Sequence, residues 1–129
     1  MTVQDHLDQA RRNENLARQL ENLAAHDWAI TVLFYGILHF VDAYLLQRHN
    51  STPGGHTTTW KKGRRIPGRN DYVKLHLPGI HDAYRVLYSA SRRARYEGAY
   101  LGPGSVGYYQ RLRDNEFASA RGFFRQLGW

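Results

Sequence analysis

The feature that most constrains the fold is a long apolar segment from Trp28 to Leu46, whose middle reads FYGILHFVDAYL. Drawn as a helix, this segment has apolar residues on nearly all sides, which is typical of a helix at the centre of a packed domain. Asp27 stands immediately before it and is a residue type that caps helix N-termini. We therefore predict a central helix over residues 28–48 with Asp27 as its N-cap.

A membrane-spanning helix is the alternative for the same segment. Its nineteen residues are close to the shortest stretch that crosses a bilayer. A carboxylate such as Asp42 in mid-span costs roughly 2.5–3.5 kcal/mol on insertion scales. Because the amphipathic segments on either side also need a surface to pack against, we expect a core helix and no membrane association. The absence of cysteine and the polar, charged start of the chain favour a cytoplasmic location.

Helical patterns also flank the central segment. Thr2 and Asp5 have the spacing of a capping box, and the apolar periodicity after them predicts a helix over about residues 3–24. A helical turn is expected to start at Asn70 and to be interrupted at Pro78.

Two more helices are predicted in the second half of the chain. One runs from Pro78 to Glu97 and ends at Gly98, and after a turn region the other runs from the capping residue Ser105 to Leu127. There is no convincing strand pattern. Residues 1–129 are therefore predicted to form a single all-α domain, a four-helix up-and-down bundle.

The long predicted loop over residues 49–69 carries most of the excess charge. The chain has 18 basic and 11 acidic side chains, and the stretch from Arg48 to Arg69 holds six basic residues and no acidic one. Such a patch favours a polyanionic partner, and loops longer than about 12–15 residues are commonly functional. Trp60 could stack on a base or simply pin the loop to the helices. The candidate binding residues of the loop are His56, Trp60, Lys61, Lys62, Arg64 and Arg65.

A second group of candidate binding residues lies on the predicted helix over residues 78–97. Their offsets of 0, 4, 7, 11 and 14 place them on one face of that helix. Arginines with an interleaved tyrosine suit phosphates and a stacked base, and the alternative is a solvated face whose arginine stems cover apolar surface. The members are His81, Arg85, Tyr88, Arg92 and Arg95.

The central helix itself carries a polar ridge. Thr31, Tyr35, His39 and Asp42 fall at offsets of 0, 4, 8 and 11, which places them on one side of the helix. Buried polar groups need hydrogen-bond partners, so the ridge is expected to face the loop, the predicted helix over residues 78–97 or a second protomer. Either Asp42 holds His39 or an arginine in an internal network, or His39 forms part of a cleft floor. We expect a supporting role for Tyr35, His39 and Asp42.

Three stretches of the sequence resemble one known family. The segments DWAITVLFYGILHFVDAYLL and HLPGIHDAYRVLYSASRRARYEG, with the basic, histidine-containing loop between them, are similar to the HEPN superfamily of small helical nucleotide- and RNA-binding domains. In that family the second helix commonly starts near a Trp or Tyr, and the third often ends in a motif that Arg93-Ala94-Arg95-Tyr96 matches. The resemblance covers roughly residues 5–127.

The resemblance implies a homodimer with a cleft between the protomers. Active members of the superfamily are metal-independent ribonucleases that use an Arg, four to six intervening residues and then a His. The His handles the proton of the ribose 2′-hydroxyl or the leaving oxygen, and the Arg stabilises charge on the phosphorane. Arg69 and His76 fit that spacing. Many other members lack the pair and serve as binding or scaffold domains.

Three functions stay open on these grounds. The leading prediction is a HEPN-like protein that binds RNA or a nucleotide, in a toxin–antitoxin or defence system. One alternative is a metal-independent endoribonuclease that uses Arg69 and His76. Another is an interaction module that pairs with a protein partner, such as a nucleotidyltransferase-like antitoxin. Because the seven histidines occur at no recognised ligand spacing, we expect no metal site and no cofactor.

Overall fold

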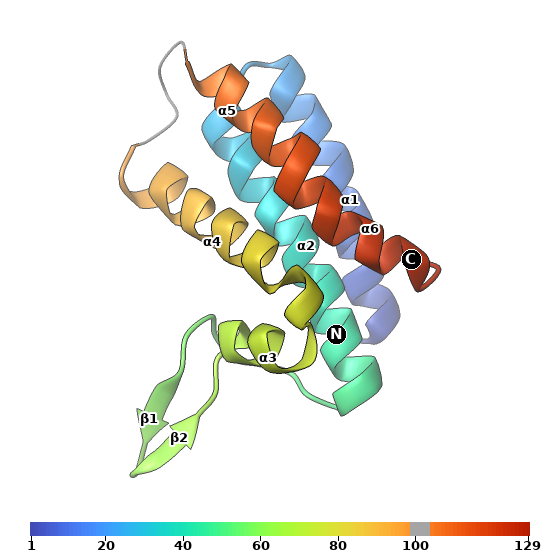
Figure 1. Ribbon diagram of the computed structural model, residues 1–129, viewed down its shortest axis with the longest axis vertical. Coiled ribbons are helices and arrows are strands. Elements are labelled where there is room, and N and C mark those ends of the chain that lie inside the picture. Colours follow the sequence, from blue (N-terminus) through green and yellow to red (C-terminus); the bar gives the residue numbers. More distant parts are fainter. Residues whose placement is uncertain (99–103) are drawn as a thin grey trace.

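The computed structural model describes residues 1–98 and 104–129, and it is mostly helical, which confirms the all-α prediction (Figure 1). Residues 99–103, part of the predicted turn region, lie outside the described residues. The helices are α1 (Val3–Asn22), α2 (His26–His49), α3 (Arg69–His76), the 3-10 helix η1 (Pro78–Ile80), α4 (His81–Tyr96), α5 (Ser105–Leu112), the π-helical segment η2 (Arg113–Phe117) and α6 (Ala118–Gln126). The strands are β1 (Thr59–Lys61) and β2 (Arg64–Ile66).

The starts of α1 and α2 show how far local signals specify helix ends. The predicted capping box is present at α1, where the backbone N–H of Asp5 donates to Thr2 Oγ1 (3.1 Å) and that of Thr2 donates to Asp5 Oδ2 (2.7 Å). The predicted N-cap of α2 is wrong: the helix begins at His26, its N-cap is Ala25, and no side chain caps it. Asp27 lies in the first turn, where its charge still complements the helix dipole.

The centre of the fold is α2, as the apolar segment predicted. Most of its residues are buried, and it packs against both α1 and α4 (Figure 1). The C-terminal helix joins the same core, since the ring of Phe40 stacks on that of Phe124 with centroids 5.3 Å apart. By length and composition α2 is also apolar enough to cross a membrane, but 72% of its most apolar stretch is buried inside the fold.

The basic loop contains a β-hairpin that the sequence analysis did not predict. Strands β1 and β2 pair antiparallel, with Trp60 opposite Arg65. Lys62 and Gly63 connect them with positive φ angles of 51° and 74°, the backbone of a type I′ turn. The hairpin extends away from the helices, and all six strand residues are exposed (Figure 1). The loop is also two residues shorter than predicted, because α2 ends at His49 and α3 starts at Arg69.

The C-terminal helix runs as three consecutive segments, α5, η2 and α6. The predicted cap Ser105 is instead the first residue of α5, after the N-cap Gly104. Its hydroxyl lies 2.9 Å from Nδ1 of His26 and so ties the start of α5 to the start of α2. Short stretches of π-helix such as η2 are uncommon and shift the register of side chains along a helix.

Candidate functional site

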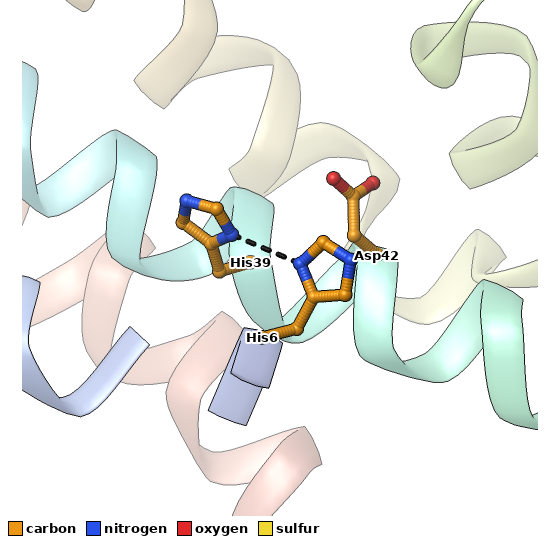
Figure 2. Close-up of side chains that lie close together, drawn as sticks. All are labelled: His6, His39 and Asp42. Atoms are coloured by element: carbon orange, nitrogen blue, oxygen red, sulfur yellow. Dashed lines mark hydrogen bonds between the residues drawn. The ribbon is translucent and has the colours of Figure 1, made fainter. Parts of the chain in front are cut away.

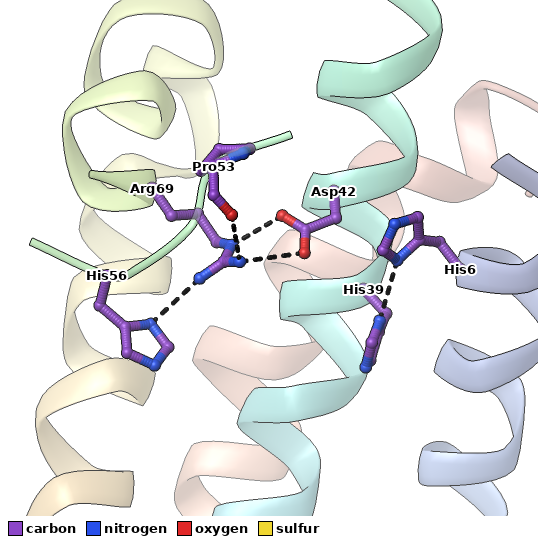
Figure 3. A network of polar contacts seen from close by, with 6 residues as sticks. All are labelled: His6, His39, Asp42, Pro53, His56 and Arg69. Carbon is purple, nitrogen blue, oxygen red and sulfur yellow. Dashed lines mark hydrogen bonds and ion pairs between the residues drawn. The ribbon is translucent and has the colours of Figure 1, made fainter. Parts of the chain in front are cut away.

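Arg69 and Asp42 form a buried ion pair at the point where α3 meets α2 (Figure 3). Arg69 Nε donates to Asp42 Oδ1 (2.6 Å) and Nη2 donates to Oδ2 (3.1 Å), so the guanidinium clamps both carboxylate oxygens. Each residue is 8% exposed. Each of these buried charges needs the other, because a buried charge without a partner destabilises the folded protein. Asp42 of the predicted ridge therefore binds Arg69, which follows the last residue of the basic loop.

The loop histidine His56 lies on the other side of the same guanidinium (Figure 3). Arg69 Nη1 and His56 Nδ1 are 3.3 Å apart. Since an arginine only donates, Nδ1 has to accept, and the proton of the neutral ring is on Nε2. No hydrogen-bond partner of Nε2 is found in the described part of the chain. The Nε2–H group of His56 is thus available to donate a hydrogen bond to a ligand.

Aromatic rings lie next to His56, and two arginines of α4 contact those rings. Its ring centroid lies 5.3 Å from that of Tyr88 and 6.5 Å from that of Tyr35. Arg95 Nη1 donates to the hydroxyl of Tyr35 (2.5 Å), and Arg92 Nη1 lies 3.4 Å from the hydroxyl of Tyr88. We call these five residues, Tyr35, His56, Tyr88, Arg92 and Arg95, the His56 cluster.

The two arginines of the His56 cluster have no carboxylate partner at ion-pair distance within residues 1–98 and 104–129. The guanidinium of Arg95 lies 5.3 Å above the ring of Tyr35 and 5.0 Å above that of Tyr96. Arg92 likewise lies 5.9 Å above the ring of Tyr88. Contacts with tyrosine faces orient a guanidinium without neutralising it. The cluster therefore presents positive charge, ring faces and an imidazole N–H together.

The environment of His56 lowers the pKa of its imidazole from the usual 6.5. Burial is the largest cause, and the positive charges of Arg69 and Arg95 add to it, while Asp42 acts in the opposite direction. The ring is therefore neutral at pH 7, in agreement with the tautomer that Arg69 requires.

This lowered pKa predicts a loss of stability in acid. The unfolded chain binds the His56 proton more tightly than the folded chain, so the stabilisation is complete above about pH 6.5 and falls as the pH drops through that value. His56→Asn offers Arg69 an amide oxygen but cannot titrate. Urea unfolding at about pH 7.5 and about pH 5 should show a smaller loss of stability in this variant than in the wild type. Equal losses in the two proteins would contradict the assignment.

Loop and α3 approach each other closely at Gly68, the N-cap of α3. The backbone N–H groups of Arg69 and Asn70 donate to the carbonyls of Gly55 (2.8 Å) and His56 (2.9 Å), which hold the loop on the helix start. A Cβ on Gly68 would overlap the carbonyl group of Thr57 and lie 2.6 Å from His56 O. Backbone atoms cannot swing aside as the tip of a side chain can.

Gly68→Ala is therefore expected to displace the segment that carries His56. The overpacked contact should lower the free energy of unfolding by about 1–3 kcal/mol and speed proteolysis of the loop. Gly54→Ala is the matched control, because a Cβ there meets no atom within 4 Å. It should change stability by no more than about 0.5 kcal/mol. If both variants behave like the wild type in urea unfolding and limited proteolysis, the close approach at Gly68 does not position His56.

A histidine pair extends the polar network on the side of Asp42 away from His56 (Figure 3). Nδ1 of His6, from α1, lies 3.1 Å from Nδ1 of His39. The two rings share one proton at this contact, because one nitrogen has to donate and the other accept. Burial lowers the pKa of both imidazoles.

The structure brings together only some of the residues predicted to act together. Arg69 and His76 are the first and last residues of α3, which separates them by roughly 10 Å along the helix axis. The ring of His76 stacks on that of His49 with centroids 3.7 Å apart. Within the described ranges, the histidine in contact with Arg69 is His56.

Most of the predicted binding residues divide into two groups, and His81 and Arg85 belong to neither. Tyr88, Arg92 and Arg95 of α4 join His56, whereas His81 lies beside Asp82 and Arg85 borders a cavity of about 240 Å³. The remaining candidates lie on the exposed hairpin, where Trp60 is 70% exposed, so its ring does not pin the loop to the helices. Arg65 of the hairpin pairs with Asp71 at 2.9 Å. This second group comprises Trp60, Lys61, Lys62, Arg64 and Arg65.

Sequence reasoning missed His6 as part of the site. It precedes its partner His39 by 33 residues, and only the packing of α1 on α2 brings the two rings together. A helical wheel could have placed His6 near Leu7 and Ala10 on the buried side of α1, but not opposite a particular residue of α2.

Comparisons of the chain with protein-family models, with curated proteins and with solved structures find no match.

Proposed function

We propose that this protein is a HEPN-like four-helix up-and-down bundle that binds RNA or a nucleotide at the His56 cluster. The observation that carries the proposal is the pair of arginines, Arg92 and Arg95, which lie beside tyrosine rings and an imidazole N–H without a carboxylate at ion-pair distance among the described residues. Phosphate oxygens accept hydrogen bonds from guanidinium groups, and bases stack on aromatic rings. The three kinds of group in the cluster suit one nucleotide.

The exposed hairpin is proposed as a second, less specific contact for a longer nucleic acid. Its four basic side chains, those of Lys61, Lys62, Arg64 and Arg65, are exposed, and the indole of Trp60 is free to stack. Such groups attract the phosphate backbone of any sequence, so the hairpin adds affinity and salt dependence more than selectivity. We further propose that the protein acts in the cytoplasm as a homodimer, as part of a toxin–antitoxin or defence system.

A titration of fluorescently labelled single-stranded RNA in EDTA tests this function. We expect binding that weakens as salt increases, with the RNA still intact on a gel at the end. An absence of binding at low salt would contradict the proposal. Cleavage that His76→Ala abolishes would instead support the endoribonuclease alternative with Arg69 and His76.

The protein-interaction alternative has one observation in its favour. Trp60, Ile66 and Leu75 are exposed apolar side chains on the hairpin and α3, at 70%, 42% and 71% exposure. Surfaces of this kind often contact another protein. Capture of a nucleotidyltransferase-like protein by the wild type, but not by a Trp60→Ala, Leu75→Ala variant, would favour this alternative.

A further inference from the structure

Three side chains with metal-binding atoms converge between α1 and α2 (Figure 2). His56 lies on the other side of Asp42 from the two histidines (Figure 3). His39 and Asp42 lie three residues apart on one side of α2, and His6 faces them from α1. The ligand atoms of the three all lie within 4.8 Å of one another. His6 and Asp42 are each 8% exposed. Two imidazoles and a carboxylate held together in a protected place are the donor set of many zinc sites.

The spacing of the two imidazoles also suits a tetrahedral ion. Two Zn–N bonds of about 2.0–2.1 Å at a tetrahedral angle place their nitrogen atoms roughly 3.3 Å apart. Nδ1 of His6 and Nδ1 of His39 are 3.1 Å apart. A metal ion can therefore replace the proton that the rings share with little movement of the nitrogens.

We propose that His6, His39 and Asp42 form a binding site for a divalent transition metal, zinc above all. Nδ1 of each histidine and one carboxylate oxygen of Asp42 supply three ligands, and water supplies the fourth. A cavity of about 200 Å³ borders two of the three side chains, and its lining residues are Met1, His6, Asp42, Thr52 and Pro53. This site departs from the expectation of no metal and does not depend on the proposed binding of RNA.

The ion pair with Arg69 determines how the site behaves. Asp42 already uses both oxygens to accept from Arg69, but each carboxylate oxygen has a second lone pair for a metal. The positive guanidinium opposes a nearby cation, so it weakens metal binding in the wild type. In Arg69→Met the carboxylate loses this partner, and a zinc ion would replace the missing charge. Zinc should therefore raise the Tm of Arg69→Met more than that of the wild type.

Equilibrium dialysis of the tag-free, full-length protein against zinc tests the site. We expect one bound zinc per chain, and the cobalt-substituted protein should show the visible absorption of a four-coordinate ion. His6→Ala and His39→Asn should each weaken binding at least about 100-fold, since even the partners that only orient metal ligands cost 10–100-fold. Circular dichroism shows whether each variant is folded, and either one alone suffices for the test.

The matched control is His49→Ala, which removes one ring of the stacked pair formed by His49 and His76. It should bind zinc like the wild type. The proposal is overturned if the wild type binds no zinc, or if His6→Ala and His39→Asn bind as tightly as the wild type. It is also overturned if only His49→Ala loses the metal.

Discussion

Asp42→Ala is expected to lower the free energy of unfolding by about 3–5 kcal/mol, because it leaves the buried guanidinium of Arg69 without a counter-charge. For a domain of this size the Tm should fall by about 10–20 °C. Urea unfolding in EDTA measures the effect and prevents any bound metal from contributing. The double variant Asp42→Leu, Arg69→Met removes both charges and should recover much of the loss.

Asp8→Ala is the matched control for this experiment. It removes a carboxylate from an exposed ion pair, in which Arg11 Nη1 lies 3.6 Å from Asp8 Oδ1. Solvent screens such a pair, so the expected loss is at most about 1 kcal/mol. If Asp42→Ala costs no more than Asp8→Ala, the pair between Asp42 and Arg69 does not hold the start of α3 against α2.

Replacing Arg92 and Arg95 together with glutamine is expected to weaken RNA binding by roughly 10- to 100-fold. Each arginine can make a charge-assisted hydrogen bond to a phosphate, and each tenfold loss of affinity corresponds to about 1.4 kcal/mol. Glutamine keeps a similar length and a donor but removes the charge. Fluorescence anisotropy with one labelled single-stranded RNA at constant salt measures the change.

Arg11→Gln, Arg18→Gln provides the matched control for that experiment. Both residues are exposed on α1, which packs on α2 and lies on the other side of it from α4 (Figure 1). This double variant loses the same net charge as Arg92→Gln, Arg95→Gln. It should bind RNA within about threefold of the wild type, because distant exposed charges are largely screened. Equal losses in the two double variants would mean that only total charge matters.

The sequence predicted the helical core well because each signal there is local. The apolar segment identified α2, and the spacing of Thr2 and Asp5 identified the start of α1. On α4, Tyr84 and Leu87 are three residues apart and both are buried. Side chains at three- and four-residue spacing lie on one face of any helix, so periodicity alone reports which side is buried.

The hairpin escaped prediction because its strands are short and charged. Each is three residues long and all of its residues are exposed, so no alternation of apolar and polar residues marks it. Its turn uses Lys62 at a positive φ of 51°, a conformation for which Asn or Gly is the usual signal. Similarly, Asp27 resembled an N-cap in the sequence, but the chain already turns into α2 at Ala25.

The contacts of the candidate site depend on tertiary packing, which the sequence could not specify. The ridge on α2 was predicted to need partners, yet two choices for Asp42, His39 or an arginine, stayed open. The loop brings Arg69 back to Asp42 across 27 residues, and it brings His56 to the same guanidinium. The resemblance to the HEPN superfamily implied His76 as the partner of Arg69, and the two lie at opposite ends of α3. Nothing in the sequence placed His6 opposite His39.

The central claim, that Arg92 and Arg95 bind phosphate groups of RNA, is tested most directly by the salt dependence of binding. For single-stranded RNA the logarithm of the affinity falls with the logarithm of salt concentration by about 0.7 for each phosphate contact. We therefore predict that Arg92→Gln, Arg95→Gln lowers this slope by about 1.4, while Arg11→Gln, Arg18→Gln leaves it unchanged. A slope in Arg92→Gln, Arg95→Gln equal to that of the wild type would contradict the claim.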